Sequence, residues 1–337
     1  MDRMTPFDVH RPATFAEAAT LLAGAGARVI AGGTDLLPNL RRGIERPPTL
    51  VDVSGIAGID EFMLGADGLR IGAGVTLARI AEDTRLEGAW QALRDAARQV
   101  GAPAHRNAAT VGGNLCLDTR CVFYNQSAWW RAANQHCLKR GGTTCHVAPQ
   151  GMRCHAAFSG DVAPALMVLG AEAEILDAHG TRRLALAQLY RDDGAAHLTL
   201  EPGELLVRLR LPHAAPGTRS GYRKARTRSA IDFPLAGIAL ALVPDGPRIG
   251  ALRVAMTGTN ARPLLLDGVD AFIGHEVDEA LLGRLGKLVA RQVSPMRTTV
   301  TPSDYRRQVA IVLAQRLLAE LAGVARTGDA SGETPWR

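Results

Sequence analysis

The sequence predicts an α+β protein made of two parts, and three observations support this fold class. Short apolar segments with strand character alternate with helical periodicity up to about residue 215. A Pro- and Gly-containing linker follows at 213–217, and beyond it come three predicted strands and then helices. The length of 337 residues suits two domains. We therefore expect domains at 1–215 and 219–325.

The first part contains its own start and stop signals. Thr14 and Glu17 form a capping box for a short helix that Gly24 ends, and Thr76 is placed to begin another helix. The apolar spacing over 89–100 predicts a third helix. Strands are expected at 28–30, 49–53 and 69–74.

The later elements follow the same logic. Asp161 is a candidate N-cap for a helix over 162–169, which Gly170 would end. Further strands are expected at 173–176, 183–186, 205–211, 220–225, 235–243 and 251–257. Helices are expected near 262–273, 277–291 and 303–323. The polar tail at 326–337 is predicted to be disordered.

Composition and charge exclude several classes of protein. The formal charge of +6 is dispersed, and no stacking aromatics accompany the arginines, which argues against binding of nucleic acid. No apolar run is long enough to span a membrane, and the first residues lack the apolar core of a signal peptide. We therefore expect a cytoplasmic protein whose cysteines are not in disulfides.

Two glycine-containing turns resemble parts of a phosphate-binding site. The turn at 31–35 follows a predicted strand, and a second Gly-Gly turn lies at 107–114. Paired glycines let a backbone approach a ligand and direct its N–H groups inward. Together the turns could hold two ends of one long phosphate-bearing ligand. The fingerprint of a dinucleotide-binding Rossmann fold is absent, so that fold is not predicted.

All five cysteines lie in one polar segment, 116–157, which has little regular periodicity. A segment this long without packing of its own is disordered or functional. Four of the cysteines are candidate ligands of one inorganic centre: Cys121, Cys137, Cys145 and Cys154. An iron–sulfur cluster is favoured over zinc, because no Cys-x2-Cys pair is present, and over inert buried thiols, because the surroundings are polar. The histidines at 136, 146 and 155 keep zinc open as an alternative.

Several motifs, in this order, are similar to the FAD-binding medium subunits of molybdenum hydroxylases, the xanthine dehydrogenase family. The motifs are AGGTDLL (31–37), LRIGAGVTL (69–77), TVGGN (110–114), SGDVAPALMVLGAEAEI (159–175) and GYRKARTRSAID (221–232). The cysteine-bearing segment departs from most members. It resembles one branch, the β subunit of 4-hydroxybenzoyl-CoA reductase, which carries an extra [4Fe-4S] cluster in such an insertion.

The resemblance implies a fold, cofactors and partners. The fold would be a two-part FAD-binding domain of the vanillyl-alcohol oxidase type, followed by a C-terminal α+β domain. The cofactors would be FAD and a [4Fe-4S] cluster, with an iron–sulfur insertion at 116–157. The partners would be a large molybdopterin subunit, a small [2Fe-2S] subunit and a ferredoxin as electron donor. The chain would relay electrons for reductive dehydroxylation of 4-hydroxybenzoyl-CoA to benzoyl-CoA.

The resemblance also implies roles for individual residues. No residue of this chain would be catalytic, because substrate chemistry would occur in a partner. The positions that match the FAD site are Val29, Ile30, Ala31, Gly32, Gly33, Thr34, Asp35, Leu36, Gly101, Thr110, Gly112, Gly113, Asn114, Asp161, Leu206 and Lys224. Of these, Asp161 would bond the sugar portion of FAD, while Leu206 and Lys224 would lie beside the isoalloxazine ring.

Two alternative functions stay open at this point. The chain could serve an oxidative molybdenum hydroxylase and pass electrons outward to an acceptor. It could also be a zinc-binding assembly subunit that has kept the fold without flavin. A covalent flavin oxidase is disfavoured, because the turn at 31–35 contains neither His nor Cys.

Overall fold

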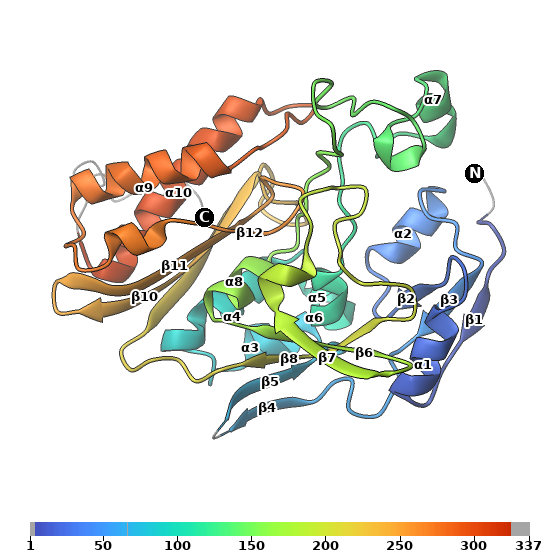
Figure 1. The fold of residues 1–337 in the computed structure, drawn as a ribbon, viewed down its shortest axis with the longest axis horizontal. Coiled ribbons are helices and arrows are strands. Elements are labelled where there is room, and N and C mark those ends of the chain that lie inside the picture. Colours follow the sequence, from blue (N-terminus) through green and yellow to red (C-terminus); the bar gives the residue numbers. More distant parts are fainter. Residues whose placement is uncertain (1–3, 66, 325–337) are drawn as a thin grey trace.

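The computed structural model describes residues 4–65 and 67–324, and it arranges three separate sheets with helices between and around them (Figure 1). The predicted disordered tail at 326–337 lies outside the described residues. Among the residues that are described, no helix combines the length and apolar character needed to cross a membrane.

The N-terminal sheet has three parallel strands in the order β1 (Asp8–His10), β3 (Thr49–Asp52), β2 (Arg28–Ile30). Helix α1 (Phe15–Leu22) connects β1 to β2, and α2 (Leu36–Arg41) follows β2. The expected cap of α1 is confirmed, because the Glu17 N–H donates to Thr14 Oγ1 at 3.2 Å. The turn at 31–35 therefore lies at the C-terminal end of a parallel strand, where open sheets commonly bind ligands.

The second sheet is antiparallel, in the order β4 (Phe62–Gly65), β5 (Gly68–Gly72), β8 (Leu205–Leu211), β6 (Glu172–Asp177), β7 (Gly180–Ala185). Five helices belong to this part of the chain: α3 (Leu77–Glu82), α4 (Gln91–Gln99), α5 (Pro103–Ala108), α6 (Val111–Leu115) and α8 (Val162–Val168). Thr76 caps α3 as predicted, since its Oγ1 accepts from the Arg79 N–H at 3.3 Å. Short 3-10 helices occur at Gly88–Trp90 and Leu186–Leu189.

The C-terminal sheet is also antiparallel, in the order β12 (Leu264–Leu265), β11 (Arg248–Thr257), β10 (Ala236–Asp245), β9 (Arg219–Ala225). Helices α9 (Glu279–Gln292) and α10 (Ser303–Ala322) complete this part. The helix predicted near 262–273 is wrong. Leu264 and Leu265 instead pair with β11, and Gly268, at a φ of 78°, separates them from a 3-10 helix at Val269–Phe272.

Alternating side-chain size along β10 gives the C-terminal sheet two different faces. Ile238, Leu240 and Leu242 belong to the core shared with α9 and α10. Ala239 and Ala241 point the other way, into the core that contains α4 and α8. Figure 1 shows this sheet between the two sets of helices. The small residues allow α4 and α8 to pack closely, so the two parts of the chain share one continuous layer of buried side chains.

The cysteine-bearing insertion has an ordered fold with a small core of its own. It contains helix α7 (Ala128–Ala133) and a 3-10 helix at Leu138–Arg140. Reciprocal backbone hydrogen bonds between Arg120 and Ala157, 3.0 and 2.8 Å long, close its base. Its core consists of Ile44, Cys121, Phe123, Tyr124, Cys137, Cys154 and Ala156. The insertion therefore packs directly on the segment that follows α2.

Candidate functional site

The first glycine turn is held against the second by a close backbone contact. A Cβ on Gly32 would lie 1.8 Å from the carbonyl oxygen of Ala108, so only glycine fits there. Gly33 adopts a φ of 67°, which turns the chain from β2 toward α2. The structure thus brings together two turns that the sequence separates, as the sequence predicts.

The second turn forms the start of α6. Thr110 Oγ1 accepts from the Gly113 N–H at 3.1 Å, and the Gly112 N–H donates to the Ala73 carbonyl at 2.8 Å. A Cβ on Gly112 would lie 2.8 Å from the Cβ of Ala73. Gly112 is therefore required by packing against the end of β5, whereas Gly113 is exposed and free to face a ligand.

A cavity of about 340 Å³ borders both turns, next to the segments 53–60 and 74–79. Twelve residues line it: Ala31, Gly32, Val53, Ser54, Ile59, Asp60, Gly74, Val75, Thr76, Arg79, Ala108 and Thr110. The Arg79 guanidinium brings a positive charge to it, held by a 2.8 Å hydrogen bond to the Asp60 carbonyl oxygen. Exposed glycine backbone together with one arginine suits the pyrophosphate of FAD. Arg79, Ser54 and Asp60 were missed in the sequence, because they lie outside any glycine motif.

Asp35 and Asn114 have partners within the protein. Asp35 accepts from Asn39 Nδ2 at 2.8 Å and pairs with Arg120 at 3.4 Å. Asn114 Oδ1 accepts from the Val162 N–H at 3.1 Å and so caps α8. The prediction that the Asp161 side chain caps α8 is wrong, because it makes no capping hydrogen bond.

Asp161 instead forms a buried network that joins the two parts of the chain. Its carboxylate accepts from Tyr222 Oη at 2.6 Å and from Lys224 Nζ at 2.8 Å. Lys224 also donates to the Gln99 carbonyl oxygen at 3.2 Å. The side chains of Asp161 and Lys224 are only 5% and 1% exposed. Burial raises the pKa of Asp161, and the Lys224 cation opposes that rise.

The remaining predicted FAD positions are not among the residues that line the cavity. Gly101, at a φ of 51°, precedes α5. Leu206 lies on β8, where its side chain is buried in the large core. Val29 and Ile30 belong to β2, Thr34 lies in the first turn, and Leu36 begins α2.

Four cysteines of the insertion are buried and are not in disulfides: Cys121, Cys137, Cys145 and Cys154. Cys121 lies within electrostatic range of Cys137 and Cys145. A hydrogen bond from Cys154 is the main cause that lowers the pKa of Cys145 to about 5. The structure thus brings these cysteines near one another. Cys116 packs against the large core, and burial raises its pKa to about 12.

Backbone N–H groups point at the sulfurs of this cysteine cluster. The Tyr124 N–H donates to Cys121 Sγ at 3.2 Å, and the Ala156 N–H donates to Cys154 Sγ at 3.5 Å. Cys145 accepts from backbone N–H groups as well. Within residues 4–65 and 67–324, no three side chains of His, Cys, Asp or Glu converge closely enough to hold a single metal ion. His146 stacks on Phe123, with ring centroids 4.1 Å apart.

Four cations surround the Tyr124 ring beside the cysteines. Arg120, Arg131, Lys139 and Arg140 lie 4.7–5.8 Å from its centroid. Lys139 is almost fully buried, and its Nζ donates to Asp118 Oδ1, Thr119 Oγ1 and the Thr119 and Gly194 carbonyl oxygens at 2.6–3.0 Å.

Comparison with known proteins identifies the family. Residues 5–214 match the FAD binding domain in molybdopterin dehydrogenase, and residues 220–321 match the CO dehydrogenase flavoprotein C-terminal domain. The aldehyde oxidoreductase FAD-binding subunit PaoB of Escherichia coli (strain K12) is 35% identical over 80% of this chain and 86% of that protein. The carbon monoxide dehydrogenase medium chain of Afipia carboxidovorans is 27% identical over 92% and 94%, respectively.

Solved structures show the same fold. Reconstituted CO dehydrogenase from Oligotropha carboxidovorans matches with a TM-score of 0.79 and 23% identity, covering 96% of this chain and 100% of that chain. Quinoline 2-oxidoreductase from Pseudomonas putida 86 matches with a TM-score of 0.75 and 24% identity, covering 96% and 99%. The chain therefore belongs to the family of FAD-binding medium subunits of molybdenum hydroxylases.

Proposed function

We propose that this chain is an electron-transfer subunit that holds FAD between its two glycine turns and a [4Fe-4S] cluster on Cys121, Cys137, Cys145 and Cys154. It would relay electrons between a large molybdopterin subunit and a small [2Fe-2S] subunit on one side and an external redox partner on the other. FAD, when bound, supplies a centre that exchanges electrons singly or in pairs. The observation that carries the proposal is the buried cysteine cluster, adjacent to the FAD turn.

The cysteine cluster has the chemistry of an iron–sulfur site. Its thiols are buried, close together and not in disulfides, and backbone N–H groups donate to the sulfurs. Hydrogen bonds to ligand sulfurs stabilise thiolates and set the potential of such clusters. A [4Fe-4S] cluster takes one thiolate per iron, so its sulfurs surround a volume and do not meet at one ion. A cluster therefore does not require the single-ion geometry that the described side chains lack.

Lys139 supplies a fixed positive charge at the same place. It lies close enough to Cys154 to lower the pKa of that thiol, against the stronger influences that raise it. Its three N–H groups are shared among four acceptor oxygens, which hold the ammonium group in a nearly dry environment. Burying a cation is costly unless nearby anions balance its charge. Asp118 supplies one negative charge beside Lys139, and thiolates bound to iron would supply more.

A direct contact joins the two proposed cofactor sites. Arg120 begins the insertion and pairs at 3.4 Å with Asp35 of the first glycine turn. Ile44, which follows α2, packs in the core that contains Cys121 and Cys137. The FAD turn and the cysteine cluster are therefore parts of one packed unit. This proximity supports electron transfer between them within the chain.

For the organic reaction, we propose oxidation of an aldehyde, with electrons leaving through this subunit. The support is the likeness to a subunit of an aldehyde oxidoreductase, 35% identical over 80% of this chain. The second candidate is reduction of 4-hydroxybenzoyl-CoA with a ferredoxin as donor. Its support is the four-cysteine insertion, on which the resemblance to that enzyme's β subunit depends.

Three further expectations enter this proposal. The FAD-binding domain would span 1–215 in the two-part arrangement of vanillyl-alcohol oxidase, supported by two separate sheets in this region. The C-terminal domain would span 219–325. Asp161, Leu206 and Lys224 would lie at the flavin, with Asp161 acting through the network that fixes Lys224.

Metal and flavin analysis of anaerobically purified protein tests the cofactors. We expect iron and sulfide in equal amounts, flavin, and no stoichiometric zinc. Cys137→Ser should remove iron and sulfide and keep flavin, while Cys116→Ser, a matched control outside the cluster, should keep all three. Zinc in place of iron, or iron retained by Cys137→Ser and Cys145→Ser alike, would refute the assignment.

Turnover by the purified complex separates the two reactions. Aldehyde oxidation with an oxidising dye and no activity on 4-hydroxybenzoyl-CoA would support the first candidate. Reduction of 4-hydroxybenzoyl-CoA by a low-potential donor, without aldehyde oxidation, would support the second. The metal analysis does not depend on either result.

A further inference from the structure

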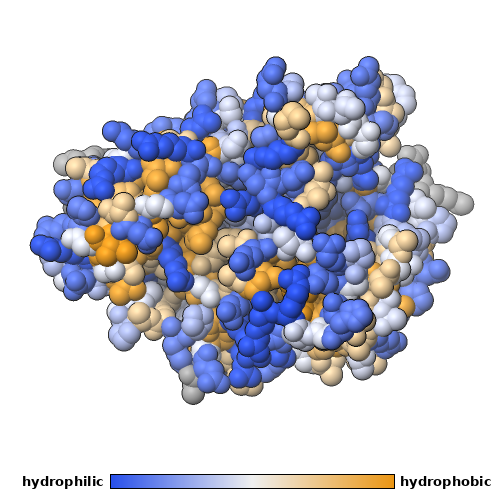
Figure 2. Space-filling model, viewed as in Figure 1, coloured by the Kyte–Doolittle hydropathy of each residue, from blue (hydrophilic) through white to orange (hydrophobic). Residues whose placement is uncertain are grey.

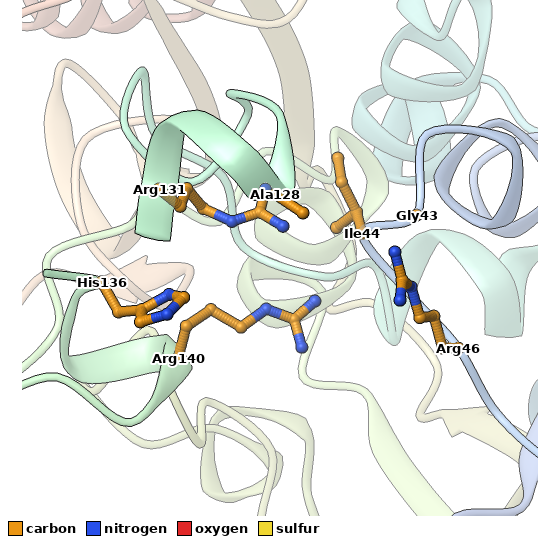
Figure 3. A pocket seen from close by; sticks show the side chains of 7 residues that line it. All are labelled: Gly43, Ile44, Arg46, Ala128, Arg131, His136 and Arg140. Carbon is orange, nitrogen blue, oxygen red and sulfur yellow. The ribbon is translucent and has the colours of Figure 1, made fainter. Parts of the chain in front are cut away.

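A second cavity, distinct from the one beside the glycine turns, lies on the outer side of the insertion. Its volume is about 200 Å³, and it is lined by Gly43, Ile44, Arg46, Ala128, Arg131, His136 and Arg140. Four segments contribute to it: the loop after α2, helix α7, the turn at His136 that follows α7, and the 3-10 helix at Leu138–Arg140. Figure 3 shows the Arg131, Arg140 and Arg46 side chains around one shared space, with His136 at its edge.

Arg131 is fixed at this cavity although it has no acidic partner. Its side chain is buried, and Nη1 donates to the carbonyl oxygens of Tyr124 and Gln126. The structure gives it no ion pair with any described carboxylate. Burial and the nearby charge of Arg140 lower the pKa of Arg131, which reflects the crowding of positive charge.

Arg140 and Arg46 complete the cationic lining. Arg140 Nη2 donates to Tyr124 Oη at 3.1 Å, but its Nε is buried and has no partner among the described residues. Arg46 folds over Gly43, and its Nη2 would lie 3.1 Å from a Cβ placed there. Arg46 makes no ion pair within the described part of the chain. The Arg46 guanidinium therefore keeps N–H groups available at the cavity.

Although burial opposes it, the Tyr124 hydroxyl with Glu45 and Asp118 raises the pKa of Arg140, whereas Arg131 and Arg46 have no ion pair among the described residues. Glu45 lies 4.0 Å from Arg140 Nη2, but it is shared with Arg28 at 3.8 Å and with Tyr124 Oη at 3.3 Å. No Asp or Glu is among the residues that line the cavity. Guanidinium groups confined together without matching anions are unfavourable, and a bound anion would relieve this repulsion.

We propose that this cavity binds a small dianionic oxyanion of the phosphate class, either free phosphate or a small phosphomonoester. Planar guanidinium groups bind tetrahedral oxyanions through paired, charge-assisted hydrogen bonds. The volume suits a phosphate group with little attached to it, and Ile44 at the cavity wall separates it from the cysteine cluster. The site does not depend on the proposed cofactors, since all its groups belong to the protein.

Calorimetric titration of the FAD-saturated full-length protein tests this proposal. Saturation with FAD occupies the proposed pyrophosphate site, and chloride keeps the ionic strength constant, so that charge screening does not change during the titration. We expect saturable binding of inorganic phosphate. Arg46→Gln should weaken it about tenfold, because it removes one charged donor. The matched control is Arg41→Gln, an equally exposed arginine outside the cavity, and it should bind as the native protein does.

The two ligand sources are distinguished by a parallel titration with phenyl phosphate. Tighter binding of the monoester would assign the site to a phosphomonoester, and binding of inorganic phosphate alone would assign it to free phosphate. Absence of saturable binding of either compound would overturn the proposal. Equal affinity in native protein and in Arg46→Gln would also overturn it, because binding would then occur elsewhere.

Discussion

The buried pair of Asp161 and Lys224 makes a quantitative prediction for Lys224→Met. Methionine keeps most of the volume of the lysine stem but removes the ammonium group. The Asp161 carboxylate would then retain one partner, the Tyr222 hydroxyl at 2.6 Å, in a site where it is 5% exposed. Because the pair links α8 with β9, its loss should weaken the contact between the two parts of the chain.

The expected loss of stability follows from this burial. Breaking a buried ion pair by removing one partner costs roughly 3–5 kcal/mol. This corresponds to a shift in the unfolding equilibrium between about a hundredfold and a few thousandfold. The double variant Asp161→Asn, Lys224→Met should recover much of the loss, because no unpaired charge then remains buried.

The pH dependence gives an independent check with a defined sign. Burial already raises the pKa of Asp161, and removing Lys224 should raise it further. The folded carboxyl would then hold its proton to a higher pH than the unfolded chain does. The variant should therefore lose stability as pH rises through the folded-state pKa, so its deficit should be larger near pH 8 than near pH 5.

Urea denaturation, followed by circular dichroism in saturating FAD, measures these differences. The control is Lys287→Met on α9, an exposed lysine, whose effect should stay within about 0.5 kcal/mol. A loss below about 1 kcal/mol for Lys224→Met would match an exposed ion pair and refute the reasoning from burial.

Three other perturbations test separate features. Gly32→Ala should abolish stoichiometric FAD binding, because the Cβ would collide with backbone, while Gly55→Ala, which has open space, should bind FAD normally. Burial lowers the pKa of His197 to about 4. As the pH falls, this histidine is therefore protonated in the unfolded chain before it is protonated in the folded one. The free energy of unfolding should fall by about 3 kcal/mol between pH 6.5 and 4. His197→Gln should remove that part of the acid sensitivity, and an unchanged profile would contradict it. Asn114→Ala should cost about 1 kcal/mol through loss of the α8 cap, measured by thermal denaturation; no change would mean that water replaces the cap.

Local signals in the sequence predicted much of the fold. The caps at Thr14 and Thr76 are found where short-range rules place them, because each hydrogen bond spans only three residues. The failure at 262–273 has the opposite origin. The apolar leucines at 264 and 265 are compatible with a helix on local grounds, but pairing with β11 overrides that preference.

Contacts between distant residues limited the prediction of the site. The sequence placed Asp161 as a helix cap, because its partners Tyr222 and Lys224 are some 60 residues away. The sequence supported the contact between the two glycine turns only as a hypothesis. It gave no indication that Arg79 would line the cavity beside them. The nearness of the four cysteines was suggested by their clustering in one segment, whereas no spacing rule reveals the N–H groups and cations that surround them.

The closed base of the insertion makes its length and sequence free to vary during evolution. Arg120 and Ala157 are already hydrogen-bonded neighbours, so the chain leaves and re-enters the domain at one point. The entropic penalty of a loop grows slowly with its length once its ends are fixed. A segment anchored in this way can be gained, lengthened or deleted while the FAD-binding domain beneath it keeps its fold, so the same scaffold can carry insertions of different length and chemistry.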